Sequence, residues 1–369
     1  MHHLILGIDP VELGGAPFAL TTDMGTNIPA RQLGLFLNDG AQAYILPCIA
    51  GHVGADTAAV ALSEAPDEDE GLTFIVDVGT NAEMLLGNQD RILAASSPTG
   101  PAFEGAQISS GQRAAPGAIE RVRIDRSTLD PKFQVIGNEL WSDNPDFAEA
   151  TKATGVTGIC GSGIIEALAE MFLNGIILHN GTIDGSLANR TSRIVPDGPT
   201  FKYLLHEGDG DQPTVYVTQN DVRAIQMAKA ALYAGYQLLN DKLDGASPTK
   251  VLLAGAFGSH IDVKYAMVLG MLPDCDLAHV KGVGNAAGTG ARMALLNYQN
   301  RQKIEDLVRR IEKIETAIEA KFQDHFVDAM ALPHAKAPFP HLAAEVSLPT
   351  PAASDNEPGD GRRRRRRRG

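Results

Sequence analysis

The sequence predicts an α/β fold built on a mixed sheet, and two observations support this prediction. The first is the composition: 38 of the 369 residues are glycine and only 5% are aromatic, which suits a fold with many tight turns better than an all-β sandwich. The second is the order of the elements expected between residues 72 and 297, which runs strand, strand, strand, helix, helix, strand, helix. Hairpin-linked strands followed by alternating helices and strands are typical of an α/β half-domain with a mixed sheet.

The first 70 residues carry few signals. Residues 4–7 are apolar and have no capping residue before them, so we expect the end of a buried element there. Residues 47–62 predict a turn followed by an alanine-rich helix. An acidic loop that contains proline, at residues 66–71, then indicates a domain boundary.

Strand signals begin after this loop. Residues 72–76 are a continuous apolar run, residues 83–87 resume it after a short break, and the turn at 88–90 leads into a return strand at 91–95. Residues 119–124 alternate apolar and charged side chains, as expected for a half-buried strand.

Helices follow in the second half. Glycine 161 opens an amphipathic helix that runs to about residue 177, and residues 178–216 predict loops with short strands. The longest helix is expected at residues 218–243, because Thr218 is a good N-cap with Asp221 three residues later, a near capping box.

The C-terminal third alternates the two element types. Residues 250–254 predict a buried strand, and residues 282–297 predict a glycine turn that runs into a helix, with no strand before it. Apolar residues at 3–4 spacing predict one amphipathic helix at 298–325, which serves either as a coiled-coil seam or, more simply, packs on its own domain. From residue 333 onward proline, alanine, serine and charge dominate, which predicts disorder.

Charge excludes one class of partner. The net charge is −13, and seven consecutive arginines at 362–368 leave 25 basic against 45 acidic residues, a net charge of −20, in the rest of the chain. A body this acidic repels phosphate backbones, so we expect no nucleic-acid partner. We interpret the arginine run as a solvated tail.

Cysteine usage and hydropathy point to a cytoplasmic protein. Cys48, Cys160 and Cys275 lie more than 100 residues apart and form no CxxC or Cys/His cluster, so neither a disulfide framework nor a self-contained metal or iron–sulfur site is predicted. We expect no signal peptide, and none of the apolar runs approaches the roughly 18 residues of a membrane span.

One candidate site lies in the turn between the first two strands. Asp77, Gly79, Thr80 and Asn81 form a DxGTN motif in which glycine allows close approach to a phosphate, and Thr80 and Asn81 add side-chain donors. Asp77 is a hard oxygen ligand that suits Mg²⁺, directly or through water. The alternative is an ordinary Asp-Gly turn.

A second candidate site follows the strand at 250–254. Small residues at the carboxyl end of a strand let a flat base lie against the backbone, and this edge of an α/β sheet is where ligands bind. A tight strand-to-helix turn is the alternative. The residues concerned are Gly255, Ala256, Phe257 and Gly258.

Two further glycine-rich stretches are less specific. Residues 282–291 do not match a dinucleotide-binding fingerprint, and their small side chains more simply let a helix pack closely on a neighbour. Residues 158–163 form a helix N-terminus suited to an anion. Cys160 in this stretch is either a thiol with a depressed pKa or, as we favour, a buried structural thiol.

The order and spacing of these motifs resemble the second half of the acetate kinase, sugar kinase, Hsp70 and actin ATPase superfamily. Five blocks between residues 76 and 297 resemble, in amino-acid sequence, the ATPase domain of the reductive activators of corrinoid proteins. They are VDVGTNAEMLLGNQDRILAASSPTGPAFEGAQISSGQRAAPGAI, TGICGSGIIEALAEM, DVRAIQMAKAAL, LLAGAFGSHID and GNAAGTGARMALLN. The resemblance spans residues 1–297 and says nothing about residues 298–369.

This resemblance implies a ribonuclease H-like (actin/Hsp70-type) ATPase subdomain with a mixed sheet. It divides the chain into a remnant of a first ATPase subdomain at 1–70, a second subdomain at 71–297, an amphipathic C-terminal helix at 298–328 and a disordered tail at 329–369 that ends in arginines. A first DxGT hairpin is missing, so the chain resembles an N-terminally truncated member or one half of a split protein with weak or absent ATPase activity.

The resemblance also implies roles for individual residues. The DxGTN turn at 77–81 would be the second phosphate motif, with Asp77 next to Mg²⁺, and the turn at 255–258 would border the adenine. Asp221 and Lys229 lie on the helix that lines the nucleotide in this superfamily. The loop at 96–112, with Glu104, either faces the nucleotide or a partner or is simply solvated.

The implied function is the ATP-dependent return of an oxidised Co(II) corrinoid protein to Co(I) in methyl-transfer metabolism, with ATP and Mg²⁺ as cofactors. The expected partner is a corrinoid protein or a cobalamin-dependent methyltransferase, and a homodimer is a further expectation. Members of the family carry a [2Fe–2S] cluster in an N-terminal domain, and this chain has no ligands for it.

The sequence is also compatible with three other functions. A small-molecule kinase of the same superfamily would need a carboxylate base that is usually found in the first subdomain. A docking or dimerisation module without catalysis would use the helix at 298–325. An activator of radical dehydratases would hold a [4Fe–4S] cluster between two subunits, for which only Cys160 is well placed.

Overall fold

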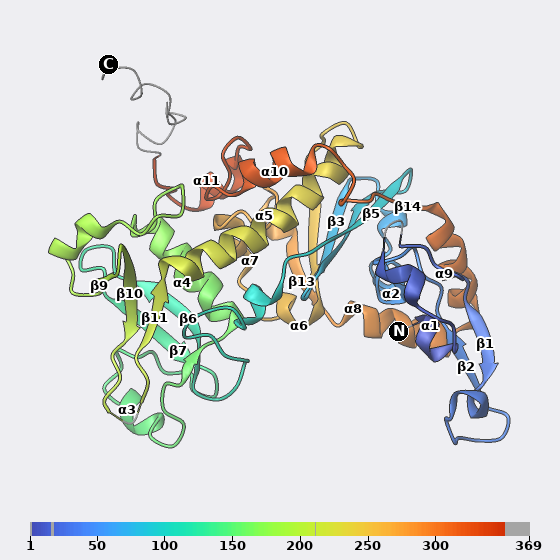
Figure 1. The fold of residues 1–369 in the computed structure, drawn as a ribbon, viewed down its shortest axis with the longest axis horizontal. Coiled ribbons are helices and arrows are strands. Elements are labelled where there is room, and N and C mark those ends of the chain that lie inside the picture. The colour runs from blue at the N-terminus through green and yellow to red at the C-terminus, as the bar shows by residue number, and fades with distance from the viewer. Residues whose placement is uncertain (1, 16–17, 211, 351–369) are drawn as a thin grey trace, which may run out of the picture.

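The computed structural model describes residues 2–15, 18–210 and 212–350, and this part of the chain has the shape of an arch (Figure 1). A central sheet and a long helix form the top. Residues 98–218, inserted between two elements of the central layer, form one arm, and residues 2–70 together with residues 285–310 form the other.

The central sheet has the strand order that the predicted fold requires. From one edge to the other, its strands are β13 (Val280–Gly284), β12 (Lys250–Ala254), β3 (Thr73–Val78), β4 (Ala82–Gly87), β5 (Ile92–Ser97) and β14 (Ile311–Lys313). Strands β3 to β5 form an antiparallel meander, and β12 and β13 continue the sheet beyond β3 as parallel strands. This mixed arrangement confirms the ribonuclease H-like prediction.

Helices cover both faces of the sheet, which explains why its strands are apolar runs without alternation. The covering helices are α5 (Gln219–Asp241) on one face and α2 (Ala55–Glu64) and α8 (Ala286–Leu296) on the other. Phe74 points to the α5 face, where its ring lies 5.0 Å from the ring of Tyr236. The next residue, Ile75, packs in the cluster that contains Val60 and Ala286.

Helices α2 and α8 are in close contact, as the small residues of α8 predict. A Cβ atom on Gly290 would lie 1.9 Å from the backbone oxygen of Ala59, so only glycine allows this approach. The strand β13 before α8 contradicts the prediction that none is present. Its residues beyond Val280 are not buried, so the strand carries no apolar run and is held by backbone pairing with β12.

The inserted arm contains two small sheets, β7–β6–β8 and β11–β10–β9, and the buried helix α4 that packs on β6. Its elements are η4 (Pro101–Glu104), β6 (Ala118–Ile124), β7 (Pro131–Val135), α3 (Phe147–Ala150), β8 (Gly158–Ile159), α4 (Gly161–Leu173), η5 (Gly185–Asn189), β9 (Ile194–Asp197), β10 (Thr200–His206) and β11 (Val215–Thr218). The predicted strand at 119–124 and the predicted helix from residue 161 are both confirmed.

The long helix α5 begins at the predicted capping box. The Oγ1 atom of Thr218 accepts a hydrogen bond of 3.1 Å from the backbone N–H of Asp221, and the Asp221 carboxylate accepts one of 2.8 Å from the backbone N–H of Thr218. Two of the unpaired groups at the helix start are thereby satisfied.

The N-terminal region is made of short elements: α1 (His2–Ile5), η1 (Val11–Gly14), β1 (Thr26–Pro29), η2 (Ala30–Leu33), β2 (Gln42–Ile45), α2 and η3 (Pro66–Glu68). The alanine-rich helix is confirmed as α2. The expectation of a buried element at residues 4–7 is wrong, because Leu4 is 58% and Ile5 44% exposed. None of the described helices combines the length and apolar character that a membrane span requires.

The prediction of a single helix at residues 298–325, within the predicted C-terminal helical segment 298–328, is wrong. The structure has α9 (Tyr298–Arg310), then β14, then α10 (Phe322–Ala329). The helix ends because Ile311 pairs with Ile92 at the open edge of β5, where backbone groups need partners. The apolar residues pack on the chain's own domain, as Ile304 and Leu307 are buried.

The disorder predicted for residues 329–369 is wrong as far as residue 350. Residues 331–348, which we name the strap, cross α5 at the top of the arch and include α11 (Pro340–Glu345). Leu332, Phe339 and Leu342 anchor the strap with exposures of 1%, 6% and 0%. These anchors are too few and too widely spaced to stand out from a composition rich in proline and alanine. Residues 351–369, including the arginine run, lie outside the described residues.

Candidate functional site

The two motifs that the sequence predicts to share a site meet at one edge of the central sheet. Strands β3 and β12 are parallel neighbours in which Asp77 pairs with Ala254, so both strands end at the same level. The short helix α6 (Gly255–Gly258) follows β12 directly, with α7 (Val263–Val268) and η6 (Leu277–His279) after it. The turn at 77–81 and the turn at 255–258 are therefore in contact.

Gly255 is the point of closest approach. Its φ angle is +85°, and a Cβ atom there would lie 2.4 Å from the Oδ1 atom of Asp77. Any other residue would push against this carboxylate and would also be strained. The Asp77 carboxylate consequently lies directly against the backbone of the second turn.

The DxGTN turn is braced from behind by the segment that follows β5. The Thr99 hydroxyl donates to the backbone oxygens of Gly79 and Thr80 at 3.1 and 3.2 Å, and the Gly100 N–H donates to Thr80 at 2.9 Å. Thr80 and Asn81 are exposed, so their side chains are available to a ligand. Thr80 donates a hydrogen bond of 3.2 Å to Glu104 of the loop predicted to face the site.

Carboxylates gather on the inner side of this hairpin. Glu83 lies opposite Asp77 in the register of β3 and β4, and Asp56 approaches both from α2. Burial and then Asp56 raise the pKa of Asp77. Burial, Asp56 and Asp77, in this order, raise the pKa of Glu83 to about 7, against a hydrogen bond of 3.3 Å from Ser96. A cation here would relieve the repulsion.

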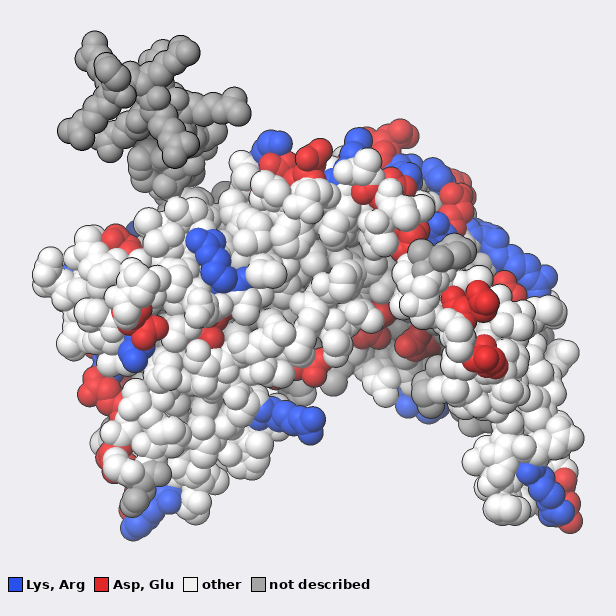
Figure 2. Space-filling model, in the orientation of Figure 1, with Lys and Arg blue, Asp and Glu red and all other residues white. Residues whose placement is uncertain are grey.

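Asn81 and Glu83 of the hairpin line a cavity of about 370 Å³ together with Asp56. A separate cavity of about 540 Å³ lies between the inserted arm and the segment after α6. Glu104 and Arg113 line it from the inserted loop, Gly161 and Ser162 from the start of α4, and His260 from the core. No side chain caps α4 and its first turn has no acidic residue, so its N–H groups and positive dipole end favour an anion. Figure 2 shows the hollow between the two arms, with acidic side chains along its wall and a basic side chain that projects into it.

Two predicted site residues lie elsewhere. Asp221 is 1% exposed, and its Oδ1 atom accepts hydrogen bonds from the backbone and hydroxyl of Ser109, so it fastens the loop 96–112 to α5. Lys229 is 0% exposed and donates to the backbone oxygens of Ala331 and Pro333 of the strap, the latter at 2.8 Å. Lys229 therefore cannot line a nucleotide, because helical periodicity directs it to the strap instead.

The cysteines are structural, as expected for Cys160. Its thiol is 1% exposed, donates to the backbone oxygen of Ile119 at 3.2 Å and lies 3.2 Å from the Ser162 hydroxyl. Burial raises the pKa of Cys48 and of Cys275 to about 11. Among the described ranges, no three His, Cys, Asp or Glu side chains are arranged to hold a metal ion by themselves.

Sequence reasoning missed Glu83, Arg113 and His260. Glu83 could have been found from the hairpin itself, because a two-stranded register that starts at the turn places it opposite Asp77. His260 could have been found from its place in the sequence, because it follows Gly258, the last residue of the second glycine turn, by two residues. Arg113 stands in a loop of small residues and carries no sequence signal that sets it apart from other surface arginines.

Two families match this chain. The family described as the C-terminal domain of RACo, the ASKHA domain, matches residues 71–343, and the family described as the RACo middle region matches residues 1–68. The ASKHA match thus extends past residue 297, where the sequence predicts the end of the second subdomain. The assignment of residues 1–70 to a remnant of a first subdomain stays a prediction.

Two named relatives are similar to most of this chain. The corrinoid activation enzyme RamQ of Eubacterium limosum is 34% identical over 336 residues, which cover 89% of this chain and 54% of that protein. The [Co(II) methylated amine-specific corrinoid protein] reductase of Methanosarcina barkeri is 27% identical over 277 residues, which cover 73% of this chain and 46% of that protein.

A solved structure is also similar. The reductive activator for corrinoid, iron-sulfur protein superposes with a TM-score of 0.76 at 32% identity, over 90% of this chain and 51% of that one. The chain therefore spans about half the length of the relatives that it matches.

Proposed function

The chain belongs to the family of RACo C-terminal ASKHA domains, and from this premise we propose that it is the ATP-binding module of a reductive activator. The activator returns an oxidised Co(II) corrinoid protein to Co(I) in methyl-transfer metabolism. One observation carries the proposal: the DxGTN turn at 77–81 and the glycine turn at 255–258 lie in contact at the carboxyl edge of a ribonuclease H-like sheet.

The residues present fit ATP and Mg²⁺. The missing Cβ at Gly255 lets the Asp77 carboxylate lie against the second turn, so that both turns border one site, and Thr80 and Asn81 offer exposed donors to phosphates. Asp77 would hold Mg²⁺, directly or through water, and the raised pKa values of Asp77 and Glu83 reflect a site that lacks positive charge. Mg²⁺ supplies charge neutralisation for the phosphates when it is bound.

Nucleotide binding would act on the arrangement of the two arms. The hairpin belongs to the core, whereas Glu104, Arg113 and the start of α4 line a cavity of the inserted arm, and Glu104 links the two parts because it accepts a hydrogen bond from Thr80 of the hairpin. A ligand that contacts both parts favours the arrangement in which both contacts are made, and it can shift the equilibrium only by this difference in affinity. We propose that this shift helps the electron donor or the cobalt of the partner into a reactive position.

A [2Fe–2S] cluster does not fit this chain. The sequence has three cysteines, which lie far apart and are buried, whereas such a cluster needs four ligands in one place. We therefore assign no electron-transfer step to the residues described. A corrinoid protein is the proposed partner, and a methyltransferase, a homodimer and a cytoplasmic location stay predictions.

Titration calorimetry tests the proposal. We expect MgATP and MgADP to bind the wild-type protein, and Asp77→Asn to weaken binding about tenfold or more, the loss of roughly 1.4 kcal/mol from one charged contact. Asp90→Asn, in the exposed turn between β4 and β5, is the matched control and should bind normally. Thermal melting of each variant shows that it is folded.

The outcomes separate the candidate functions. Nucleotide binding that accelerates reduction of a Co(II) corrinoid protein by an added electron donor supports the activator. Phosphoryl transfer to an added sugar or acid supports the small-molecule kinase instead. A folded wild-type protein that binds neither nucleotide contradicts both and leaves a docking module.

A further inference from the structure

Glu104 of the inserted arm lies against the turn that is proposed to bind phosphates. Its carboxylate accepts a hydrogen bond of 3.2 Å from the hydroxyl of Thr80. Thr80 is also an exposed side chain that the DxGTN turn offers to a nucleotide as a hydrogen-bond donor. A donor of the proposed site is therefore already engaged by an acidic side chain of the protein itself.

The backbone on both sides holds this hydrogen bond in place. The backbone oxygen of Thr80 accepts a bond of 2.9 Å from the N–H of Gly100. Glu104 stands between Phe103, which is 1% exposed, and Gly105, which ends the short helix η4 with a φ angle of +79°. The two side chains therefore meet because two fixed segments of the chain lie side by side.

The Glu104 carboxylate has no counter-charge. Within the described part of the chain Glu104 forms no ion pair, and its hydrogen bond comes from a neutral hydroxyl. Arg113 lines the same cavity but does not pair with it. A carboxylate that is not neutralised repels any anion that approaches the same donor.

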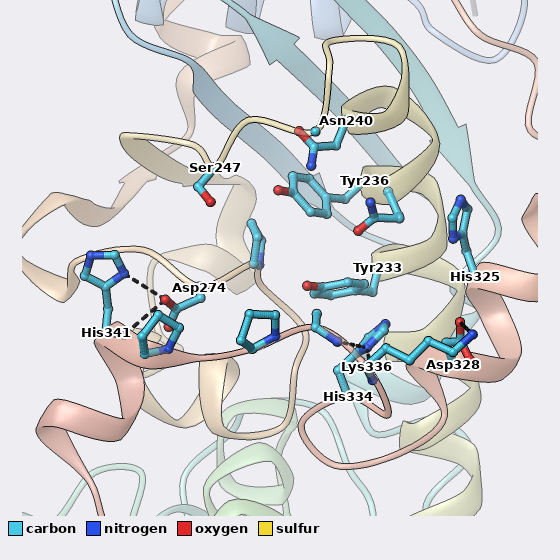
Figure 3. Close-up of a pocket in the computed structure, with 16 residues that line it drawn as sticks. Tyr233, Tyr236, Asn240, Ser247, Asp274, His325, Asp328, His334, Lys336 and His341 are labelled. Atoms are coloured by element: carbon cyan, nitrogen blue, oxygen red, sulfur yellow. Dashed lines mark hydrogen bonds and ion pairs between the residues drawn. The ribbon is translucent and has the colours of Figure 1, made fainter.

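Carboxylates that line another large cavity are paired, which makes the contrast informative. This cavity, of about 450 Å³, lies between α5 and the strap (Figure 3). Asp274 accepts a hydrogen bond of 2.7 Å from His341, and Asp328 lies 2.7 Å from Lys336. Both of these carboxylates have a basic partner in the cavity wall, and Glu104 has none among the residues that the structure describes.

The cavity on the other side of the turn carries charge of the same sign. Asp56 and Glu83 line it, and Asp77 lies opposite Glu83 in the register of β3 and β4. Its described lining includes no lysine and no arginine. Phosphates at this turn therefore meet carboxylates from both the core and the inserted arm, and a divalent cation is the natural means to neutralise them.

We propose that Glu104 makes the site selective for a nucleotide that carries a divalent cation. This inference rests on the proposed function and names a residue that sets its specificity. A metal-free nucleotide has to displace the carboxylate from Thr80 and then stays next to its negative charge. With a cation beside the phosphates this repulsion is offset, so the hydroxyl is released at a lower cost. No covalent step is involved.

Glu104→Gln tests this role, because it keeps an acceptor for Thr80 and removes only the charge. Titration calorimetry measures the affinity for ADP with Mg²⁺ and, in the presence of EDTA, without it. The wild-type protein should bind metal-free ADP at least about tenfold more weakly than MgADP. In Glu104→Gln we expect metal-free ADP to bind about fivefold more tightly than in the wild type, and MgADP to change by less than about twofold.

Glu139→Gln is the matched control. It removes the charge of an exposed glutamate elsewhere in the inserted arm, so both affinities should equal those of the wild type. The same gain in both variants would show an effect of net charge and overturn the proposal. Weaker binding of MgADP by Glu104→Gln would show that Glu104 contacts the cation or the nucleotide directly, and no gain for metal-free ADP would show a merely structural role. Each of these outcomes also overturns it.

The measurements separate this inference from the proposed function. A wild-type protein that binds both forms of ADP equally well contradicts the role of Glu104 and leaves the nucleotide site in place. A wild-type protein that binds neither form contradicts both proposals. Glu104→Gln should melt at the wild-type temperature, because it changes only an exposed group, so a change in affinity does not come from loss of the fold.

Discussion

Helices α4 and α5 each carry an ionisable side chain into the interior, and the two helices satisfy that group in opposite ways. Glu166 of α4 is 0% exposed and accepts hydrogen bonds of 2.6 Å from Arg121 and Arg123 and of 3.0 Å from the backbone of Val122. Lys229 of α5 is equally buried, but it is bonded only to neutral backbone oxygens of the strap.

This difference separates a permanent contact from one that depends on conditions. The Glu166 partners lie on strand β6 of the same arm, and the two arginines pair their charges with the carboxylate. Lys229 has no counter-charge, so burial lowers its pKa well below the ordinary value. We expect the inserted arm to be held firmly and the strap to be held in a way that varies with pH.

The largest effect is expected from Glu166→Ala. The substitution leaves two partly buried arginines and one buried backbone N–H without their acceptor, which should lower the free energy of unfolding by about 3 kcal/mol. Urea denaturation measures this loss. Glu149→Ala removes the carboxylate of an exposed ion pair in the same arm and should change the stability by less than about 0.5 kcal/mol. Equal effects of the two substitutions would contradict the ranking.

Lys229→Met tests the other side of the comparison. Two backbone oxygens lose their donor, but the cost of burying the amine is also removed, so we expect a net loss of only about 1 kcal/mol. The clearer sign is pH dependence. A lysine with a lowered pKa binds a proton in the unfolded state and not in the folded state, so the wild-type stability rises with pH between the folded pKa and about 10.4, by at most about 1.4 kcal/mol per pH unit.

Urea denaturation at several pH values between 7 and 10 measures this slope. The slope should be shallower in Lys229→Met, and limited proteolysis should cut the variant earlier after α10, since the strap is less well held. Lys242→Met, which removes an exposed lysine near the end of α5, is the control and should keep the wild-type slope. The same slope in all three proteins would show that Lys229 does not titrate in this range.

The same comparison explains how much the sequence could predict. The central strands, α4 and α5 were predictable because each carries a long apolar pattern and local signals such as the capping box at Thr218. The contact between Asp77 and Gly255 could also be predicted, because Asp77 lies near the end of β3 and Gly255 follows β12, and the two strands end at one sheet edge. In each case the residues that determine the structure lie within a few positions of one another in the sequence or within one pair of neighbouring strands.

Long-range partners were not predictable. Lys229 was expected to line a nucleotide, since the spacing on a helix says which residues share a face but not what lies against that face. Its partners are 102 and 104 residues away, in a segment whose composition suggests disorder. The strand β14 was hidden for the same reason: Ile311 continues a helical pattern and becomes a strand only because the edge of β5 is free.

Glu83 extends the comparison to the proposed nucleotide site. It is half-buried like a core residue, yet its charged neighbours are carboxylates, and its pKa is raised to about 7. Folding therefore favours the protonated form, and stability falls as pH rises from about 4.5 to about 7. Mg²⁺ needs the ionised form, so the affinity for MgADP should rise up to about tenfold from pH 6 to pH 8. Calorimetry at both pH values should show a flat profile for Glu83→Gln, whereas a profile as steep as that of the wild type would contradict this assignment.

The smallest effect is expected where the two regions touch. The Tyr265 hydroxyl, on helix α7 of the core, donates to Glu170 of α4, and the ring of Tyr265 lies 4.9 Å from the guanidinium of Arg123. Glu170 also accepts a 3.1 Å hydrogen bond from the backbone of Ile124, so the carboxylate joins the inserted arm to the core. Tyr265→Phe keeps the ring and removes only the hydroxyl, which should lower the stability by about 1 kcal/mol.

A contact that joins the inserted arm to the core should also affect ligand binding, because the proposed nucleotide contacts both parts. Tyr265→Phe should weaken MgADP two- to threefold, whereas Tyr203→Phe, with a similar loss of stability but both partners inside the inserted arm, should leave the affinity unchanged. Calorimetry on the two variants separates a positioning role from a merely structural one. If both variants bind MgADP equally well, the hydroxyl of Tyr265 stabilises the protein without setting the position of the inserted arm on the core.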